Sequence, residues 1–322
     1  MAGTTVGLAT APACLAHRAG DAHPERPARL EAILGRLAEE GLRPRMRELP
    51  PRAATTEDLA LCHTAGHIAK VHDACLASLP LDPQTTPVPA SWDAALFAAG
   101  AGLAAAEAIV AGEVTRAFCA VRPPGHHAGP DSSAGFCLFN NVGIAARHCQ
   151  RRLGIPRVAI VDFDVHHCDG TQGIFWADGT VLVASIHQYG ANPLNPAVPF
   201  YPGSGAETET GGGPGTGCIF NAPVPPGAGL GDYEEAILER FTPAIEAFRP
   251  GILLVSAGFD GHRDDPLALM DLSTEDYGLI TRLIVGIADR VCQGRVLSML
   301  EGGYHLEALA SAATAHVKAL ME

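Results

Sequence analysis

Hydrophobic and polar positions follow two patterns along the chain. Short runs rich in β-branched residues alternate with longer segments in which alanine and leucine recur at helical spacing. Strands are predicted at Thr5–Ala9, Thr115–Val121, Arg157–Phe163, Thr180–His187, Ile252–Ala257 and Arg295–Leu300. Helices are predicted at Arg26–Glu40, Glu57–Leu79, Trp92–Ala111, Leu138–Leu153, Asp232–Phe248, Thr274–Cys292 and His305–Met321. This alternation is typical of an α/β fold, in which helices cover both faces of a mostly parallel sheet.

The chain contains no internal repeat and no long charged or serine-rich linker that would divide it. Its 322 residues, 47% of them hydrophobic, suffice for one large core. We therefore predict a single domain over residues 1–322. Glycine and proline gather in loops such as 121-VRPPGHHAGP-130, which follows a predicted strand. In an open parallel sheet the functional loops lie past the carboxyl ends of the strands, so a site is expected there.

Charge and cysteine content narrow the function classes. Asp plus Glu number 35 against 22 for Lys plus Arg, a net charge of −13, so the broad basic surface of a nucleic-acid-binding protein is missing. A cationic substrate would suit this charge better. The 9 cysteines form no CxxC pair, which fits a reducing cytosol. We recognise no secretory start and no segment that approaches a charge-free membrane span. A cytoplasmic protein that binds neither nucleic acid nor membranes is expected.

An unusual set of polar residues ends one predicted strand. The stretch 158-VAIVDFDVHHCDG-170 carries Asp162, Asp164 and His166 at alternate positions. If the strand stays extended that far, the three side chains share one face. Burying such groups is costly unless they are paired or bind a metal. One of them alone would equally suit a helix cap, but three in register, followed by Asp169, indicate a site.

A second predicted strand end adds a carboxylate. In 251-GILLVSAGFDGHRDDP-266, Asp260 follows an apolar run and lies in a glycine-flanked turn, where an aspartate is common. With Asp164 and His166 it completes a carboxylate–imidazole–carboxylate set. Three protein ligands with one open position are typical of catalytic zinc sites.

Two further clusters follow other predicted strands. His126 and His127 lie in the constrained loop RPPGHH, and Tyr304 follows two glycines in 300-LEGGYH-305. Taken alone, the histidines would equally be a surface pair. The tyrosine would equally be an aromatic residue packed on the core at a helix start. Each cluster gains weight because it lies after a predicted strand, as Asp164 and Asp260 do.

The ordered motifs RPPGHH, GFCLFNN, DFDVHHCDG, SAGFD and EGGY, preceded by HPERPARL, resemble those of the histone deacetylase family of zinc amidohydrolases, in particular its class II-like bacterial members. The resemblance extends from about residue 17 to residue 305. It implies a three-layer αβα domain with an eight-stranded, mostly parallel sheet, the arginase/deacetylase-like fold. It also implies a zinc-dependent deacetylase that acts on linear amides.

The resemblance assigns the metal centre and its histidines. It implies that Asp164, His166 and Asp260 hold one zinc ion and that His126 and His127 flank the reacting water. Amide hydrolysis needs a polarised carbonyl and a nucleophilic water, which zinc supplies by Lewis acidity and by lowering the pKa of water towards about 7. A histidine, with His127 as the favoured candidate, would take the proton of the water and pass it to the leaving amine.

The resemblance also assigns supporting residues. Asp162 would orient His126, Asp169 would orient His127, and Tyr304 would donate its hydroxyl to the developing oxyanion. The walls of a narrow substrate tunnel would be formed by Phe136, Gly135 and Tyr201. A structural potassium ion is implied beside the zinc site, with ligands from Asp162, Asp164, His166, Ser185 and Ile186.

Two cysteines lie close to the predicted site. The family usually has glycine where HHCDG has Cys168, and a left-handed backbone there would strain a cysteine. We expect a helix start at Cys168 instead, with activity retained. Cys137, in GFCLF near the tunnel, is expected to be a small buried side chain.

The substrate is the least determined property, because the family includes enzymes for acetylated lysine, acetylpolyamines and other small acylated amines. Polyamine specialists can place a glutamate seven residues after the second zinc aspartate, where this chain has Leu267. Leucine resembles the lysine deacetylase pattern. Asp82, in 80-PLDPQTTP-87, is expected at the rim, where it would hold the substrate backbone. We predict acetyl-lysine in a peptide or protein as substrate, with an acetylated polyamine or small amine as the alternative.

The same motifs allow three competing interpretations. An arginase-like binuclear manganese hydrolase would need extra carboxylates, but the residue two positions after Asp260 is His262. A non-catalytic module that binds acylated lysine would be expected to lack a metal ligand or Tyr304. A purely structural origin of every cluster would need several coincidences. The sequence leaves open the acyl-chain preference, zinc or iron in the cell, and whether the chain forms a homo-oligomer.

Overall fold

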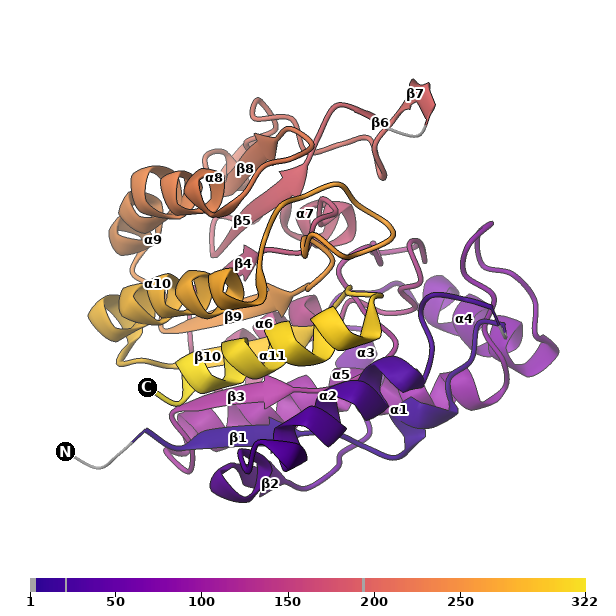
Figure 1. Ribbon diagram of the computed structural model, residues 1–322. Helices are drawn as coiled ribbons and strands as arrows, with labels where there is room; N and C mark the ends of the chain where they lie inside the picture. The colour runs from indigo at the N-terminus through magenta and orange to yellow at the C-terminus, as the bar shows by residue number, and fades with distance from the viewer. Residues whose placement is uncertain (1–3, 21, 193–194) are drawn as a thin grey trace.

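The computed structural model describes residues 4–20, 22–192 and 195–322. Its centre is an eight-stranded sheet with the order β2-β1-β3-β10-β9-β4-β5-β8, in which all neighbouring strands are parallel (Figure 1). The strands are β1 (Val6–Ala9), β2 (Arg47–Leu49), β3 (Arg116–Cys119), β4 (Val158–Asp162), β5 (Val181–Gln188), β8 (Ile219–Val224), β9 (Ile252–Ala257) and β10 (Val296–Leu300). Outside this sheet, β6 (Ala191–Asn192) and β7 (Asn195–Pro199) pair antiparallel as a hairpin.

Helices cover both faces of the sheet (Figure 1). On one face α11 (Leu306–Leu320) packs between α2 (Ala28–Glu39) and α10 (Thr274–Cys292), and on the other α5 (Ala90–Val110) packs against α6 (Asn141–Arg152). The remaining helices are α1 (Ala13–Ala16), α3 (Thr56–Leu59), α4 (Ala65–Ala77), α7 (Asp169–Phe175), α8 (Leu230–Glu235) and α9 (Thr242–Phe248). A π-helical turn (Ala236–Phe241) links α8 to α9, and 3₁₀ turns lie at Arg43–Arg45 and Gly213–Gly215. The predicted three-layer αβα fold is confirmed.

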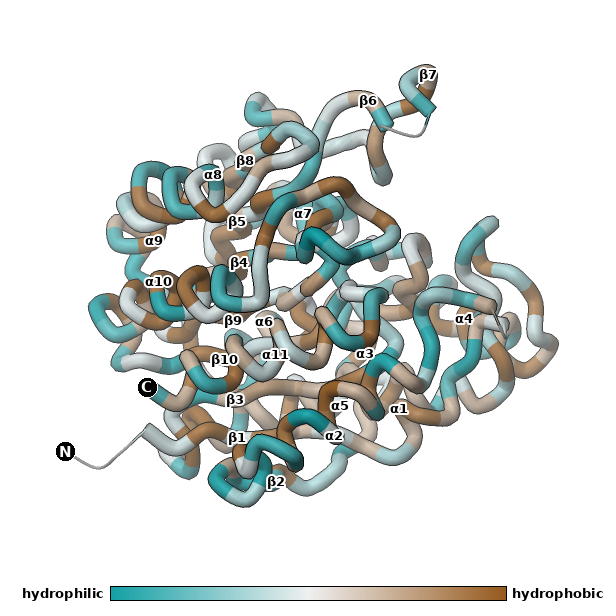
Figure 2. The backbone as a smooth tube through the Cα atoms, viewed as in Figure 1, coloured by the Kyte–Doolittle hydropathy of each residue, from teal (hydrophilic) through white to brown (hydrophobic). Residues whose placement is uncertain are grey.

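The central strands are apolar because helices cover them on both sides. Every residue of β4, β5, β9 and β10 is buried, as expected for strands of a parallel sheet without a solvated face. Figure 2 shows hydrophobic segments running through this interior, with hydrophilic ones on the outer turns of the helices and on the loops. The polar residues that close these strands are therefore placed at the carboxyl edge of the sheet by the core behind them.

One core helix bears on the expectation that no segment approaches a charge-free membrane span. Among the described residues α5 is the one helix long and apolar enough to cross a membrane by length and composition, although it contains Asp93 and Glu107. However, 67% of its apolar window is buried inside the molecule. Ala98, Ala99 and Ala105 are almost fully covered there. The helix is a core element of the fold, so its apolar composition is weak evidence for a membrane.

Two predicted helix boundaries were wrong because capping residues interrupt the apolar pattern. The helix predicted over Glu57–Leu79 is two helices, α3 and α4, since Thr64 starts α4 by accepting a hydrogen bond from the backbone N–H of His67. The helix predicted from Leu138 begins at Asn141, because the Asn140 side chain accepts a hydrogen bond from the N–H of Gly143.

The hydrophobic pattern missed short elements. The edge strand β2 has only 3 residues, and β8 reads IFNAPV, with a polar and a proline position inside it. The hydrophobic pattern did not indicate α7, whose start was expected only from Cys168, and the helix predicted over Asp232–Phe248 contains the π-helical turn. All of these elements are too short or too mixed to show a helical or strand period.

Candidate active site

The end of β4 is a series of turns. The strand was predicted to end at Phe163, and a shared face was predicted only if the extended backbone continued to His166; β4 ends at Asp162. Beyond it, Asp162 Oδ1 accepts a hydrogen bond from the N–H of Asp164 (2.9 Å), and Asp164 Oδ1 accepts one from the N–H of His166 (2.9 Å). Aspartates that bond the backbone two residues on favour turns over strands. The condition of an extended backbone as far as His166 is therefore not met, although the side chains do gather at this edge.

Asp164, His166 and Asp260 converge from the ends of β4 and β9. Their ligand atoms lie within 4.8 Å of one another. His166 Nδ1 is 3.1 Å from Asp164 Oδ1 and 3.2 Å from Asp260 Oδ2. Asp260 Oδ2 is buried and accepts no well-aligned hydrogen bond from the described residues, a costly state for a carboxylate oxygen without a cation. Two carboxylates and one imidazole form a donor set that fits zinc.

The charges of this trio favour a cation at its centre. Burial by itself lowers the pKa of His166, but the carboxylates of Asp164 and Asp260 outweigh it and raise the pKa to about 10. Burial by itself raises the pKa of Asp164, but His126 and His166 outweigh it and hold the pKa below its usual value. Because the trio stabilises a positive charge so strongly, a divalent ion suits the same place.

Gly302 explains why glycines follow β10. A Cβ atom there would lie 2.1 Å from Asp260 Oδ2 and 2.6 Å from Asp164 Oδ2. The N–H of Gly302 donates a hydrogen bond to Asp164 Oδ2 at 2.8 Å. The glycine of the EGGY motif at position 302 therefore lets the backbone pack directly against two carboxylates of the trio.

The two loop histidines each contact a carboxylate. His126 Nδ1 is 3.0 Å from Asp162 Oδ2, and His127 Nδ1 is 2.7 Å from Asp169 Oδ1. Their ring centroids are 4.0 Å apart. Burial lowers the pKa of His126, but the carboxylates of Asp164 and Asp162 outweigh it and raise this pKa well above its usual value. Burial and the neighbouring His126 lower the pKa of His127 to about 4. The pKa values of two adjacent imidazoles are thus shifted in opposite directions.

Glu301 and Arg29 hold this loop and the tyrosine loop, and neither residue was given a role from the sequence. Glu301 Oε2 accepts hydrogen bonds from the N–H groups of Gly125 (2.6 Å) and His126 (3.2 Å). Arg29 donates to the carbonyls of Gly303 (2.5 Å) and Glu301 (2.6 Å). Its guanidinium lies 4.8 Å from the ring centroid of Tyr304. Their only sequence signal was membership of the HPERPARL and EGGY motifs.

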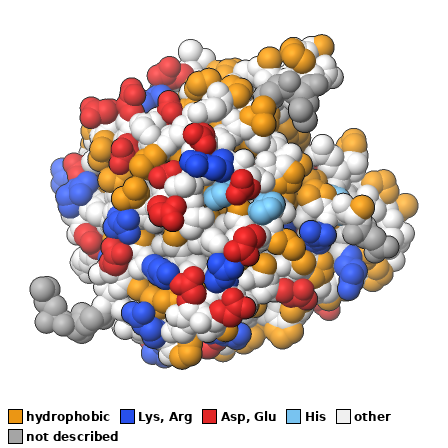
Figure 3. Space-filling view, viewed as in Figure 1, with side chains coloured by type: hydrophobic (Ala, Val, Ile, Leu, Met, Phe, Trp, Pro, Cys, Tyr) orange, Lys and Arg blue, Asp and Glu red, His pale blue; other side chains and the backbone are white. Residues whose placement is uncertain are grey.

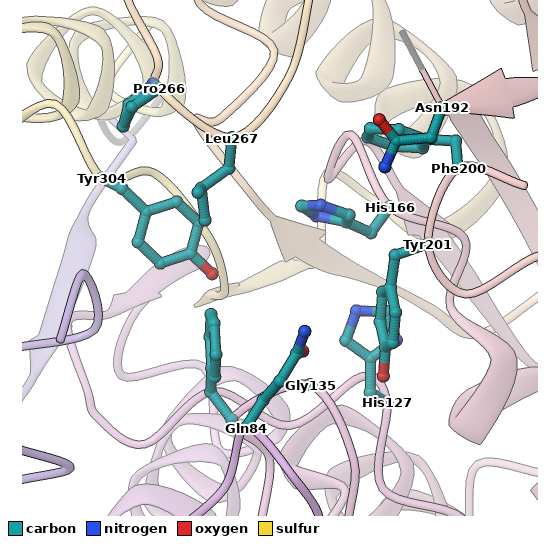
Figure 4. Close-up of a pocket in the computed structure, with 11 residues that line it drawn as sticks. Gln84, His127, Gly135, His166, Asn192, Phe200, Tyr201, Pro266, Leu267 and Tyr304 are labelled. Carbon is teal, nitrogen blue, oxygen red and sulfur yellow. The ribbon is translucent and has the colours of Figure 1, made fainter. Parts of the chain in front are cut away.

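A cavity of about 270 Å³ opens above the trio. Figure 4 shows Tyr304 on one side with its hydroxyl directed into the cavity, and His127 and Tyr201 on the opposite side. The described residues that line it are Gln84, His127, Gly135, Phe136, His166, Asn192, Phe200, Tyr201, Pro266, Leu267 and Tyr304. Asp, Glu, Lys and Arg are missing from this described lining.

The tunnel wall requires an unusual backbone. Gly135 and Phe136 have positive φ values of 52° and 69°. A Cβ at Gly135 would lie 2.3 Å from His127 Cδ2 and 3.0 Å from the Tyr201 hydroxyl. Glycine is therefore required beside the histidine, and Phe136 keeps a conformation that is rare for a bulky residue. Phe200, which was not selected from the sequence, stacks on His166 with 5.3 Å between centroids.

The rim combines Leu267 with a neighbouring loop. Leu267 lines the cavity and is 37% exposed. In the 80–87 loop Gln84 lines the cavity, whereas the carboxylate of Asp82 accepts a hydrogen bond from the N–H of Gln84 at 2.7 Å. The predicted contact of Asp82 with substrate stays a prediction, and Gln84 is a cavity residue of this loop that the sequence did not indicate.

Asp265 connects this rim with the tyrosine loop. Its Oδ1 accepts a hydrogen bond from the N–H of Leu267 (3.0 Å), and its Oδ2 accepts one from the N–H of Tyr304 (2.7 Å). The residue is 7% exposed. One buried carboxylate therefore sets the position of both a rim residue and Tyr304.

The remaining predicted residues have clear positions. Ser185 pairs with Asp162 in the β4–β5 register, and Ile186 follows it in β5. Cys168 caps the start of α7 with φ −78°, so the expected helical start is confirmed. Burial raises the pKa of the Cys137 thiol well above its usual value, consistent with an unreactive side chain.

The geometry does not favour a binuclear centre. His262, two residues after Asp260, hydrogen-bonds the N–H of Asp264 and the hydroxyl of Thr274. In the described part of the chain, the trio is the one cluster of His, Cys, Asp or Glu side chains with metal-ligand spacing.

Comparison with known proteins identifies the family. The histone deacetylase domain matches residues 23–320. A probable deacetylase of Archaeoglobus fulgidus is 38% identical over 91% of this chain and 79% of its own length. The human polyamine deacetylase HDAC10 is 38% identical over 92% of this chain and 44% of its own length. The crystal structure of the HDA15 HD domain superposes with a TM-score of 0.92 at 37% identity, covering 99% of this chain and 90% of that one. The chain therefore belongs to the histone deacetylase family of zinc-dependent amidohydrolases.

Proposed function

We propose that this chain is a zinc-dependent deacetylase that removes the acetyl group from acetyl-lysine side chains in peptides or proteins. One observation carries the proposal: the two-carboxylate, one-imidazole trio reaches a cavity of about 270 Å³ through His166, which lines it together with His127 and Tyr304. This arrangement supplies a metal-binding floor, a proton carrier and a hydroxyl donor within one narrow cavity.

The residues around the floor suit amide hydrolysis. Asp164, His166 and Asp260 would hold zinc, which when bound supplies the Lewis acidity that polarises the amide and activates water. Asp169 fixes Nδ1 of His127, which leaves Nε2 to take a proton from water and return it to the leaving amine nitrogen. The Tyr304 hydroxyl is suited to donate a hydrogen bond to the oxyanion that replaces the amide carbonyl.

The cavity walls support a linear, uncharged guest. Phe136 and Tyr201 offer apolar faces to a methylene chain. Leu267 stands at the mouth, where a free ammonium would need a carboxylate as partner. An acetyl-lysine side chain has no free ammonium, because its nitrogen is an uncharged amide, whereas a monoacetylated polyamine has one. This difference favours the peptide.

We also infer a structural potassium ion beside the zinc site, as the family resemblance implies. Its support is the adjacency of Asp162 and Ser185 in the β4–β5 register, which brings oxygen donors together next to Asp164 and His166. Oxygen ligands suit a hard cation.

The test compares kcat/KM of the zinc-loaded protein on an acetyl-lysine peptide and on N-acetylputrescine. The peptide is expected to be preferred, and Tyr304→Phe should lower kcat by about 10²–10³-fold as for other lost oxyanion donors. Preference for acetylputrescine would support the polyamine alternative, to which the similarity of human HDAC10 also points. Binding of the peptide without cleavage of either substrate would support a non-catalytic module.

A further inference from the structure

Exposed hydrophobic side chains gather at the mouth of the active-site cavity. Eight large hydrophobic residues of the described chain are substantially exposed, and four of them are Tyr189, Val198, Leu267 and Leu269. Leu267 lines the cavity itself. The N–H of Leu269 donates a hydrogen bond to Gln188 Oε1 at 3.0 Å, directly before Tyr189. Such a concentration beside a cavity is typical of a binding surface.

A second cavity, of about 310 Å³, lies between the β6–β7 hairpin and the end of β5. Its described lining includes Tyr189, Ala191, Pro196, Val198 and Phe200, and contains no ionisable side chain other than the Tyr189 phenol. Figure 3 shows hydrophobic side chains over the hairpin at the upper right of the molecule. This cavity is therefore suited to an uncharged, apolar group.

Phe200 is shared by the two cavities. One face of its ring stacks on His166, with an interplanar angle of 5°. Its backbone N–H donates a hydrogen bond to the carbonyl of Gly190 at 2.8 Å. The N–H of Tyr189 donates to the carbonyl of Val224 at 2.9 Å and so ties the base of the hairpin to β8. The wall between the cavities is thus held by the sheet.

We propose that this second cavity, which we call the hairpin subsite, binds the apolar side chain of a residue adjacent to acetyl-lysine in a peptide substrate. The inference rests on the proposed function. A peptide held by its acetyl-lysine in the first cavity emerges at the mouth, where a neighbouring residue meets Phe200 and the hairpin. The absence of charge in the described lining selects against an acidic or basic neighbour, because burying an unpaired charge is costly.

The experiment uses the full chain and three acetyl-lysine peptides that carry Gly, Leu or Asp on each side of the acetyl-lysine. In the wild type, kcat/KM should be about tenfold higher for Leu than for Gly, the effect of partly burying one aliphatic side chain. The Asp peptide should be the poorest substrate. Val198→Asp should reduce the Leu-to-Gly ratio to about 2 or less.

A matched control tests whether any surface charge has this effect. Leu238 is 48% exposed on the π-helical turn between α8 and α9, and Leu238→Asp should keep the wild-type ratio. Equal kcat/KM for Leu and Gly in the wild type would overturn the subsite, as would an unchanged ratio in Val198→Asp. A change of molecular mass in light scattering caused by Val198→Asp would assign the cavity to contact with a second copy, which also overturns it.

Binding measurements separate this inference from the proposed function. Fluorescence anisotropy with labelled Leu and Gly peptides on Tyr304→Phe reports the subsite without turnover. If no peptide is cut, the proposed function fails, and the anisotropy measurement alone tests the hairpin subsite. About tenfold tighter binding of the Leu peptide then supports the subsite, and equal binding overturns it.

Discussion

The floor and the rim of the active site are built in opposite ways. The floor, which comprises Asp164, His166, Asp260 and the His126–His127 pair, is buried at the ends of central strands. The rim, which comprises Leu267, the Gln84 loop and the β6–β7 hairpin, is largely exposed and contributes no strand to the main sheet. This difference indicates that the sheet sets the positions of the buried side chains of the floor, whereas loops outside the sheet select which molecules reach them.

The largest effect should come from His127, the proposed proton carrier of the floor. His127→Asn is expected to lower kcat by about 10³-fold, because it removes the proposed general acid and base but none of the proposed metal ligands. The zinc content of the variant, measured by elemental analysis, should remain that of the wild type. Loss of zinc in proportion to activity would instead show that His127 helps to hold the metal.

A glycine of the floor should tolerate no side chain. Gly302→Ala places a methyl group against Asp164 and Asp260, and such overpacking should weaken zinc binding by about 10–100-fold, measured by titration with a competing chelator. Gly35→Ala is the matched control, because a Cβ there meets nothing within 4 Å. In helix α2 that change should leave zinc affinity unchanged and slightly raise the Tm. Equal zinc affinity in both variants would contradict the packing argument.

Asp265 allows the separation of floor and rim to be tested directly. Asp265→Asn cannot accept from the N–H groups of both Leu267 and Tyr304, since only one side-chain oxygen remains. We expect kcat to fall by about tenfold, as for the loss of one hydrogen bond to a charged group. If Asp265 acts by positioning Tyr304, the same change in a Tyr304→Phe background should have almost no further effect on kcat. A full tenfold loss in that background would assign Asp265 a structural role instead.

The smallest effect concerns pH and the interior behind the floor. The Thr281 hydroxyl donates to the carbonyl of Tyr277, so it accepts from Nδ1 of His316, and Nε2 accepts from Ser298. Burial of this neutral ring lowers the pKa of His316 to about 3. The unfolded chain therefore takes up a proton below about pH 6.5 that the folded chain does not. The free energy of unfolding thus decreases as the pH is lowered, by up to about 1.4 kcal/mol per pH unit. His316→Gln should remove that part of the slope in urea unfolding between about pH 6.5 and 4.5. An unchanged slope would contradict a neutral buried His316.

The sequence predicted the floor better than the rim. Asp162, Asp164, His166 and Asp260 could be selected because each follows a strongly apolar run, and a parallel sheet brings the ends of such runs together. The prediction was right about this edge, but the extended backbone on which the shared face depended does not continue beyond Asp162, since the competing Asp-to-backbone hydrogen bonds have no hydrophobic period.

The residues that sequence reasoning missed act through contacts across long sequence separations. Arg29 contacts the carbonyl of Gly303, which lies 274 residues away, and no local pattern encodes such a pair. Gln84 and Phe200 become neighbours of the cavity only through irregular loops. Short edge elements such as β2 were missed because 3 residues are too few to show a period.

The order of strands has a consequence for synthesis of the protein. β10, the last strand to leave the ribosome, lies between β3 and β9 and joins the β2-β1-β3 group to the β9-β4-β5-β8 group. Until β10 is available, the edges of β3 and β9 have no partner from the other group, and unpaired edges favour association with other chains. A nascent chain that stalls before residue 296 is therefore expected to form two separate half-sheets, with the three proposed zinc ligands already synthesised but Tyr304 not yet synthesised.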